Sequence, residues 1–203
     1  MALPDASTVG VIGVGRQASY QLEAVCAVRP IKKVKVFSRT QENREAFARE
    51  MSERLGIEVE PVAEAEDAVR GCQVVIAITN SATPVFDGSA LEPGTHVNAA
   101  GSNSWLRREV DNTTIQRSSL IVVDNLEQAK TECGELMLAS EQGVFRWSEA
   151  VELKDVVSGR ITRPSSDAIT LFESQGIGIE DVACCAVVLR KAREKGIGTE
   201  LPY

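Results

Sequence analysis

Apolar and polar positions along the first 124 residues form two alternating patterns. Short apolar runs, typical of strands, occupy residues 8–12, 34–37, 57–62, 74–78, 96–100 and 120–123. Between these runs, apolar residues recur at helical spacing from residue 18 until Pro30. Thr40 is in position to cap a charged helix that runs through Leu55, and residues 65–69 predict a short helix. Strands that alternate with helices in this rhythm predict βαβ units and a parallel sheet.

The pattern changes after Asp124, where helical spacing dominates. We expect helices over residues 128–141, 149–158 and 177–195, the last one ended by Gly196. Within the last helix, residues 182–189 are apolar around the whole circumference. Such a helix is normally covered on every side, and a sheet covers only one. The pattern therefore predicts a partner surface for this helix, either a further domain or a second copy of the chain.

A glycine turn separates the first predicted strand from the first predicted helix. Its sequence, Gly13-Val-Gly-Arg-Gln-Ala18, matches the GxGxx(G/A) form of the dinucleotide-binding fingerprint. The first glycine permits a tight turn, the second admits a pyrophosphate, and the alanine keeps the helix close to the sheet. A purely structural glycine turn is the alternative, but the βαβ context favours binding. We expect an α/β fold of the Rossmann type, a doubly wound parallel sheet with helices on both faces and a C-terminal helical extension.

The end of the second predicted strand bears on the choice of nicotinamide cofactor. An acidic residue there would hydrogen-bond the ribose of NAD, but this chain has Ser38, Arg39 and Thr40, and its first acid is Glu42. The hydroxyls can donate to a phosphate and the guanidinium can pair with one. We therefore expect NADP (NADPH) in preference to NAD, with a solvent-exposed Arg39 of no special role as the alternative.

Charge and cysteine content exclude several classes of function. The net charge of −7 argues against nucleic acid as a partner, and no basic run suggests binding to a membrane surface. No apolar run is long enough to span a membrane, and residues 1–8 lack the pattern of a secretory signal. The odd number of cysteines, 5, without CxxC spacing suggests neither a disulfide framework nor a zinc site. We expect a cytoplasmic protein without a metal.

Several motifs together resemble the ornithine cyclodeaminase/mu-crystallin family over nearly the whole chain. They are the glycine turn, Pro84-Val-Phe, the stretch from Pro93 to Gly101 (PGTHVNAAG), Val122-Val-Asp124 followed by Gln128 and Glu132, Gly159-Arg160, Ile169 to Gly176 (ITLFESQG), and Ile179-Glu-Asp181. The resemblance implies hydride transfer at a carbon bearing nitrogen, with an amino acid or a cyclic imine as the substrate.

The resemblance also implies roles for individual residues. The pyrophosphate would lie on Gly13, Gly15, Arg16, Gln17 and Ala18, and the adenine-ribose phosphate on Ser38, Arg39 and Thr40. The nicotinamide side would be lined by Thr79, Val97, Asn98 and Ser174. Asn103 and Arg107 stand where the cyclodeaminases have a proton-transferring Asp and a Lys, so they are candidate substrate-pocket residues. Since an amide does not exchange protons as a carboxylate does, a ketimine reductase or amino-acid dehydrogenase is favoured over an ornithine cyclodeaminase.

The family that the chain resembles normally carries a substrate and dimerisation domain before the glycine turn, and we expect that domain to be absent from this chain. We expect residues 1–145 to form the NAD(P)-binding Rossmann domain. Residues 146–203 would complete that domain and carry a helical extension that packs on the absent domain or in a homodimer. A truncated, non-catalytic NADP(H)-binding module is the alternative function, because a cofactor domain alone is not a complete site.

Other residues with reactive or aromatic side chains receive a structural interpretation. His96 has no evident partner that would orient it as a base, so a structural or exposed role is favoured over catalysis. Core packing is favoured for Trp105 and Trp147, with a place in a pocket or an interface as the alternative. Solvated surface positions are expected for three acids of the predicted helix, Glu132, Glu135 and Glu141.

Overall fold

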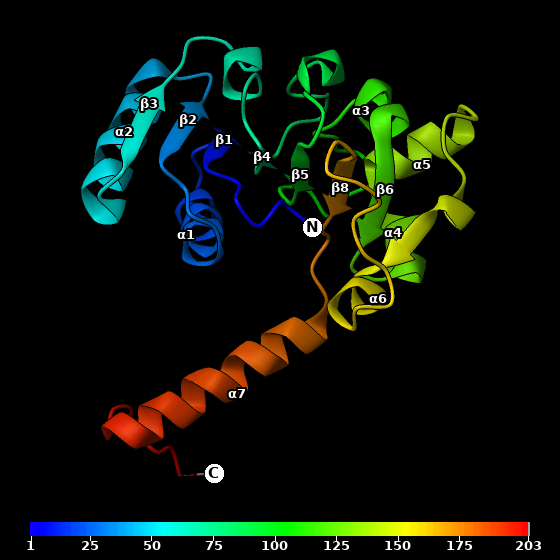
Figure 1. Ribbon diagram of the computed structural model, residues 1–203. Coiled ribbons are helices and arrows are strands. Elements are labelled where there is room, and N and C mark those ends of the chain that lie inside the picture. Colours follow the sequence, from blue (N-terminus) through cyan, green and yellow to red (C-terminus); the bar gives the residue numbers. More distant parts are fainter. Residues whose placement is uncertain (203) are drawn as a thin grey trace.

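The computed structural model describes residues 1–202 and builds them around a sheet of parallel strands (Figure 1). The order of the strands is β3-β2-β1-β4-β5-β8-β6-β7. Their bounds are β1 Thr8–Ile12, β2 Lys33–Phe37, β3 Glu58–Pro61, β4 Val74–Ala77, β5 His96–Ala99, β6 Ser118–Val123, β7 Ala150–Glu152 and β8 Ile169–Glu173. The helices are α1 Ala18–Val28, α2 Gln41–Leu55, α3 Asn112–Arg117, α4 Leu126–Glu132, α5 Gly134–Glu141, α6 Leu153–Val157 and α7 Gly178–Lys195.

Helices cover both faces of this sheet. Successive residues of a strand point to opposite faces, and those of β4 do so: Val74 and Ile76 pack in one core cluster, Val75 in the other. The first cluster contains side chains of α1 and α2, and the second contains side chains of α3, α4 and α5. All four residues of β4 are buried, as expected for a central parallel strand. The predicted doubly wound α/β fold is confirmed.

The strand order places a topological switch point beside β1. From β1 the chain proceeds outward through β2 to β3, and it then returns to build β4 and β5 on the other side of β1. In open α/β sheets, ligands bind at the carboxyl ends of the strands at such a point. The glycine turn follows β1 directly, so the sequence motif and the topology indicate the same location.

The C-terminal third differs from the helical region that the sequence pattern predicts. The strand β8 inserts between β5 and β6, and the predicted helix over 149–158 begins instead as the short edge strand β7. The pattern misses β8 because its buried positions include Thr170 and Glu173, which resemble a half-exposed segment. Thr170 and Glu173 are buried by contacts with other parts of the fold, and the local pattern of apolar and polar residues does not predict such contacts.

The helix predicted over 128–141 is in fact two helices, α4 and α5. The chain leaves helical geometry at Cys133 (φ −82°, ψ 93°), and α5 begins at the next residue. A Cβ atom at Gly134 would collide with the backbone oxygen of Arg107, so glycine is required where α5 packs against that loop. Close packing between distant segments therefore ends the first helix.

The final helix, α7, projects away from the body (Figure 1). None of its residues is buried, and its large apolar side chains are 41–71% exposed. The predicted helix is present from residue 178 to 195, and its apolar circumference is uncovered in the single chain. Within residues 1–202, no helix has the length and hydropathy needed to cross a membrane.

Candidate active site

A cleft of about 1010 Å³ runs along the carboxyl edge of the sheet, across the switch point. Its walls come from the segments that follow five strands: β1, β2, β4, β5 and β8. The sequence-predicted residues that line it are Gly13, Gly15, Arg16, Gln17, Ser38, Arg39, Thr79, Asn103 and Ser174. The fold thus forms one continuous surface from segments that lie far apart along the chain.

The two glycines of the turn serve different purposes. Gly13 has φ +101°, and a Cβ atom there would lie 2.5 Å from the backbone oxygen of Ile78. Only glycine fits that conformation and that contact without strain. At Gly15, by contrast, a Cβ atom would meet nothing within 4 Å. Because Gly15 has no side chain, the space beside it in the cleft is open, and a ligand can approach its backbone.

The N-terminus of α1 is suited to an anion. Its cap residue, Gln17, makes no side-chain capping bond, and the first turn contains no acidic residue. Among residues 1–202, the backbone N–H groups of Gly15, Arg16 and Gln17 have no hydrogen-bond acceptor. Unpaired N–H groups and the positive end of the helix dipole are the features that bind phosphate. The open cradle at Gly15 and these free donors together fit a pyrophosphate group.

The part of the cleft beyond β2 is free of acidic groups. It is lined by Phe37, Ser38, Arg39 and Asn43, and Arg39 is exposed there. The acidic residues of the lining, Glu180 and Asp181, belong to the start of α7, and burial raises the pKa of Glu180. One end of the cleft is therefore basic and the other acidic.

Five predicted site residues lie outside the cleft wall. Ala18 and Val97 are fully buried in the two core clusters, and Asn98 is half-buried in β5. Thr40 is the residue before α2, where the sequence also predicts a helix cap, although its hydroxyl makes no capping bond. Arg107 is exposed on the loop after β5, away from the lining. Ala18 retains the predicted packing of α1 against the sheet.

The loop after β8 is held by a buried carboxylate. The side chain of Asp124, at the end of β6, accepts hydrogen bonds through Oδ2 from the Ser174 hydroxyl (3.0 Å) and from the backbone N–H of Gln175 (2.8 Å) and Gly176 (2.7 Å). On its other side, the Gln128 amide donates to the backbone oxygen of Gly176 at 2.9 Å. The Ser174 side chain is therefore part of a fixed loop.

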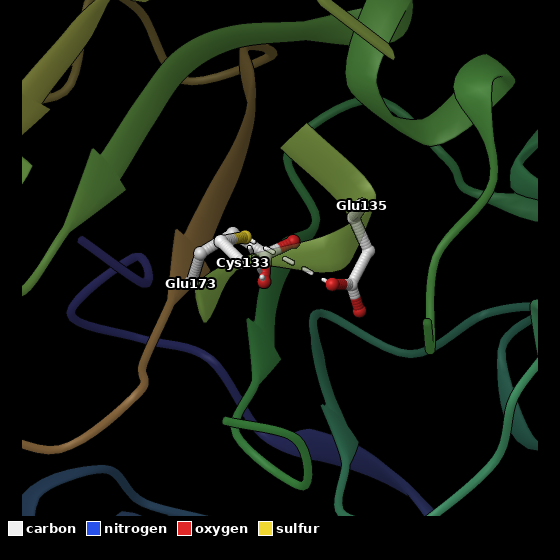
Figure 2. Close-up of side chains that lie close together, drawn as sticks. All are labelled: Cys133, Glu135 and Glu173. Atoms are coloured by element: carbon white, nitrogen blue, oxygen red, sulfur yellow. Dashed lines mark hydrogen bonds between the residues drawn. The ribbon is translucent and has the colours of Figure 1, made fainter. Parts of the chain in front are cut away.

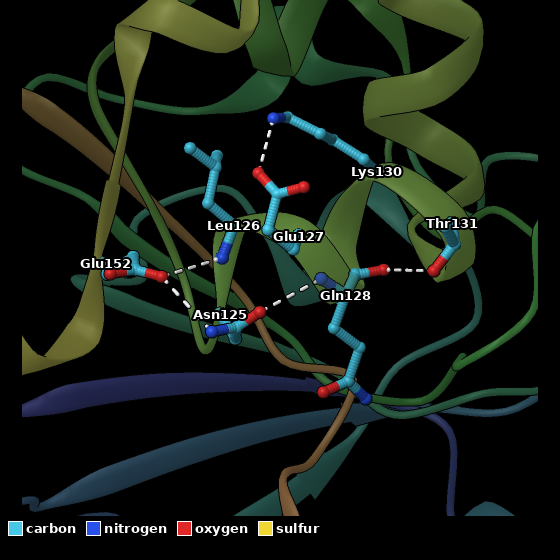
Figure 3. A network of polar contacts seen from close by, with 7 residues as sticks. All are labelled: Asn125, Leu126, Glu127, Gln128, Lys130, Thr131 and Glu152. Carbon is cyan, nitrogen blue, oxygen red and sulfur yellow. Dashed lines mark hydrogen bonds and ion pairs between the residues drawn. The ribbon is translucent and has the colours of Figure 1, made fainter.

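Gln128 is itself oriented by the start of α4 (Figure 3). The side chain of Asn125 caps this helix by accepting from the backbone N–H of Gln128 at 3.0 Å. Glu152, at the end of β7, accepts from the Asn125 amide and from the backbone N–H of Leu126. This network joins β7 to α4 and supports the loop of Ser174 from behind.

A cluster of buried acids lies beneath the same part of the cleft, and the sequence did not predict it (Figure 2). The Cys133 thiol donates to Glu135 at 3.8 Å and to Glu173 at 3.7 Å, and all three residues are buried. Burial raises the pKa of each group, and the neighbouring carboxyls raise the pKa of Glu173 further. Their ligand atoms lie within 4.8 Å of one another.

Two sequence interpretations need correction here. Glu135 is only 4% exposed and is not a solvated surface charge, because α5 turns it inward toward the backbone of Glu109. Trp105 is 63% exposed and does not pack in the core, since it lies on the loop after β5. Trp147 packs edge-on against Phe145 with 5.3 Å between ring centroids, in agreement with a packing role.

His96 is a buried structural residue at the amino end of β5. Its Nδ1 atom lies 2.8 Å from the hydroxyl oxygen of Thr170 in β8. Burial lowers the pKa of His96 to about 3, so the ring is neutral at physiological pH. The structural interpretation of His96 agrees with this position at the edge opposite the cleft.

Known proteins resemble this chain over nearly its whole length. The model of the ornithine cyclodeaminase/mu-crystallin family matches residues 1–196. A Delta(1)-pyrroline-2-carboxylate reductase of Bacillus cereus is 34% identical over 100% of this chain and 63% of its own length. The chain therefore spans less than two thirds of that relative.

Two solved structures superpose closely on the fold. One is Thermococcus litoralis Delta(1)-pyrroline-2-carboxylate reductase in complex with NADH and L-proline, with a TM-score of 0.94 and 37% identity over 99% of this chain and 62% of that one. The other is a dimeric archaeal alanine dehydrogenase with bound NAD, with a TM-score of 0.90 and 35% identity over 100% and 62% of the two chains.

Proposed function

The chain belongs to the ornithine cyclodeaminase/mu-crystallin family, and from that premise we propose that its cleft binds a nicotinamide dinucleotide. The reaction proposed is hydride transfer at a carbon bearing nitrogen, in an amino acid or a cyclic imine. The observation that carries the proposal is the cleft at the switch point, with an open cradle at Gly15 and free N–H groups at the start of α1. These features suit the pyrophosphate of a dinucleotide.

The rest of the cleft gives the dinucleotide its direction. With the pyrophosphate on the glycine turn, the basic end at Arg39 suits the adenosine half. The nicotinamide half then lies across the ends of β4, β5 and β8, against Thr79, Gly101 and Ser174. The bound cofactor supplies the hydride chemistry, and the residues of the chain position the ring and shield it from water.

We propose a reductase or dehydrogenase activity in preference to cyclodeamination. Asn103 lines the cleft at the position where the cyclodeaminase motif has a carboxylate. An amide side chain neither gives nor accepts a proton at neutral pH, so it cannot perform that proton transfer. The relatives described above are a pyrroline-carboxylate reductase and an alanine dehydrogenase, which supports the same preference.

The choice between NADP and NAD rests on opposing observations. Ser38 and Arg39 line an end of the cleft without acids, which favours the additional phosphate of NADP. The two solved relatives contain NADH and NAD, so NAD is the competing cofactor. We propose that Arg39 gives this chain a preference for NADP, and titration with both cofactors decides the matter.

A second candidate is a cofactor-binding module without catalysis. It is favoured by α7, none of whose residues is buried. We propose that α7 is covered by a second protein surface, in a homodimer or against a further domain, since so many apolar side chains of one helix are exposed together.

We also propose a cytoplasmic location, because the five cysteines are free thiols.

Calorimetric titration with NADPH and NADH, followed by assay of imine reduction, separates these candidates. Binding together with turnover of Delta(1)-pyrroline-2-carboxylate or a related cyclic imine supports the enzyme, provided that Ser174→Ala lowers turnover. Binding without any turnover supports the module. Absence of binding by either cofactor contradicts the cofactor assignment in both.

A further inference from the structure

The carboxyl group of Glu109 joins two loops of the cleft. Its Oε1 atom accepts a hydrogen bond from the backbone N–H of Thr79, which follows β4. Its Oε2 atom accepts one from the backbone N–H of Gly101, which follows β5, at 2.6 Å. Both partners line the cleft, whereas Glu109 itself is 1% exposed and lies behind them. One buried side chain therefore fixes the carboxyl ends of two adjacent strands to each other.

The contact between these loops is close enough to exclude any side chain at residue 101. A Cβ atom at Gly101 would collide with the backbone nitrogen and oxygen of Thr79 and would lie 2.6 Å from Oε1 of Glu109. Each oxygen of a carboxylate accepts one N–H here, an arrangement that the ionised form satisfies and a neutral amide does not. The loops are thus held at van der Waals distance by two hydrogen bonds to one carboxyl group.

Glu109 is held in turn from the core side. Its backbone N–H donates to Oε1 of Glu135 at 2.6 Å, and its backbone oxygen accepts from the backbone N–H of Val85 at 2.9 Å. Glu135 is the acid that shares the Cys133 thiol with Glu173 (Figure 2). A chain of buried contacts therefore runs from the cleft wall to α5 and β8, and it leaves Glu109 little freedom to move.

We infer that Glu109 is a positioning residue for the nicotinamide half of the proposed cofactor, acting through Thr79 and Gly101. This inference rests on the proposed function, which places the nicotinamide at the ends of β4 and β5. In the proposed orientation, the pyrophosphate and the adenosine lie on the segments after β1 and β2, and the Glu109 carboxyl contacts neither segment. Its loss therefore affects one half of the dinucleotide and spares the other.

A matched residue exists at the opposite edge of the same two strands. Glu92, just before β5, accepts a hydrogen bond through Oε1 from the backbone N–H of Gly71, just before β4, at 3.0 Å. Like Glu109 it joins the segments of β4 and β5 through a backbone N–H, but it is exposed, accepts a single hydrogen bond, and lies at the amino ends of the strands, away from the cleft. Glu92→Gln is therefore the control for Glu109→Gln.

The test compares the binding of NADH and ADP-ribose, which lacks the nicotinamide, to the 203-residue chain and its variants by calorimetry. Glu109→Gln is expected to weaken NADH binding about tenfold, the effect of losing one hydrogen bond to a charged acceptor. The same variant should bind ADP-ribose within about twofold of the original chain, and Glu92→Gln should change neither affinity. NADPH replaces NADH if it is the preferred cofactor, with 2′-phospho-ADP-ribose as its truncated form.

Equal weakening of both ligands by Glu109→Gln, or no weakening of either, would overturn the inference and leave Glu109 as a general structural tie. An unmodified chain that binds neither ligand would instead overturn the proposed function. If Glu109→Gln fails to fold by circular dichroism, Glu135→Ala takes its place, because it removes the acceptor of the Glu109 backbone N–H and leaves the contacts of the Glu109 carboxyl intact. It should produce a smaller loss for NADH alone, and an equal loss for both ligands counts against the inference.

Discussion

The two halves of the cleft are built in opposite ways. The half over β1 and β2 is formed by short continuous segments, residues 13–17 and 37–39, whose backbone and cationic side chains face solvent. The half over β4, β5 and β8 has its loops held from behind by buried carboxyls, Glu109 and Asp124, which come from other parts of the chain. The first half depends on open space and charge at the surface. The second depends on polar groups sealed in the core, whose loss affects stability as well as binding.

The largest contrast is expected between alanine substitutions at Gly101 and Gly15. A Cβ atom at Gly101 collides with the backbone of Thr79, so Gly101→Ala should lower the free energy of unfolding by about 3 kcal/mol. Gly15→Ala meets open space and should change it by less than about 0.5 kcal/mol, while weakening dinucleotide binding. Urea denaturation and calorimetric titration measure the two effects. If both substitutions lowered the free energy of unfolding equally, the proposed difference between the two halves of the cleft would be wrong.

The buried acids predict a pH dependence confined to the second half. Because the pKa of Glu173 is raised in the folded state, Glu173 holds a proton above pH 4.5 that it releases on unfolding, so its contribution to stability falls as pH rises. The limiting slope is about 1.4 kcal/mol per pH unit. Glu173→Gln should therefore be progressively more stable than the original chain as pH rises from about 5 to about 8. The residual slope combines Glu109 and Glu135, whose pKa values are raised too, with His96, whose lowered pKa contributes a slope of opposite sign below pH 6.5.

Denaturation of both proteins at several pH values checks this. Asp124 and Cys133 also face Glu173, so Glu127→Gln, at an exposed position of α4, is the control that changes the net charge without changing the cluster. A constant stability difference across the pH range would show that Glu173 titrates as an ordinary carboxyl.

Replacing Asp124 by Asn tests the loop of Ser174 at a somewhat smaller cost. The carboxylate accepts three hydrogen bonds through one oxygen, and a neutral amide accepts them less strongly. We expect a loss of about 2 kcal/mol in stability together with weaker cofactor binding. Asp111→Asn is the control, because Asp111 accepts from the backbone N–H of Gly88 and Thr114 away from the cleft. It should lose similar stability and bind the cofactor normally.

The same division explains what the sequence predicts well and what it does not. The glycine turn and the strands β1, β2, β4, β5 and β6 are local patterns, so periodicity and one fingerprint locate them. Ser174 was placed through family resemblance, and its loop geometry comes from Asp124, 50 residues away. Glu109, Glu135 and Glu173 are buried by contacts between distant segments, and nothing in their immediate sequence distinguishes them from surface acids. Val97 was assigned to the site by its motif, but strand alternation turns its side chain into the core.

The smallest predicted effect concerns the surface charge at the adenosine end. Arg39 is exposed, and its guanidinium has no hydrogen bond or ion pair among residues 1–202, so Arg39→Ala should leave the unfolding transition unchanged. If the guanidinium pairs with the 2′-phosphate of NADP, the variant should bind NADPH about tenfold more weakly, a loss of about 1.4 kcal/mol, while NADH affinity stays the same. Arg49→Ala, an exposed position of α2 outside the cleft, should change neither. Because the interaction is exposed, the NADPH effect should shrink as salt is raised, whereas the effects of Glu109 and Asp124 should persist, since buried contacts are screened far less. An unchanged NADPH affinity in the variant would assign the site to NAD and reduce the basic end of the cleft to ordinary surface charge.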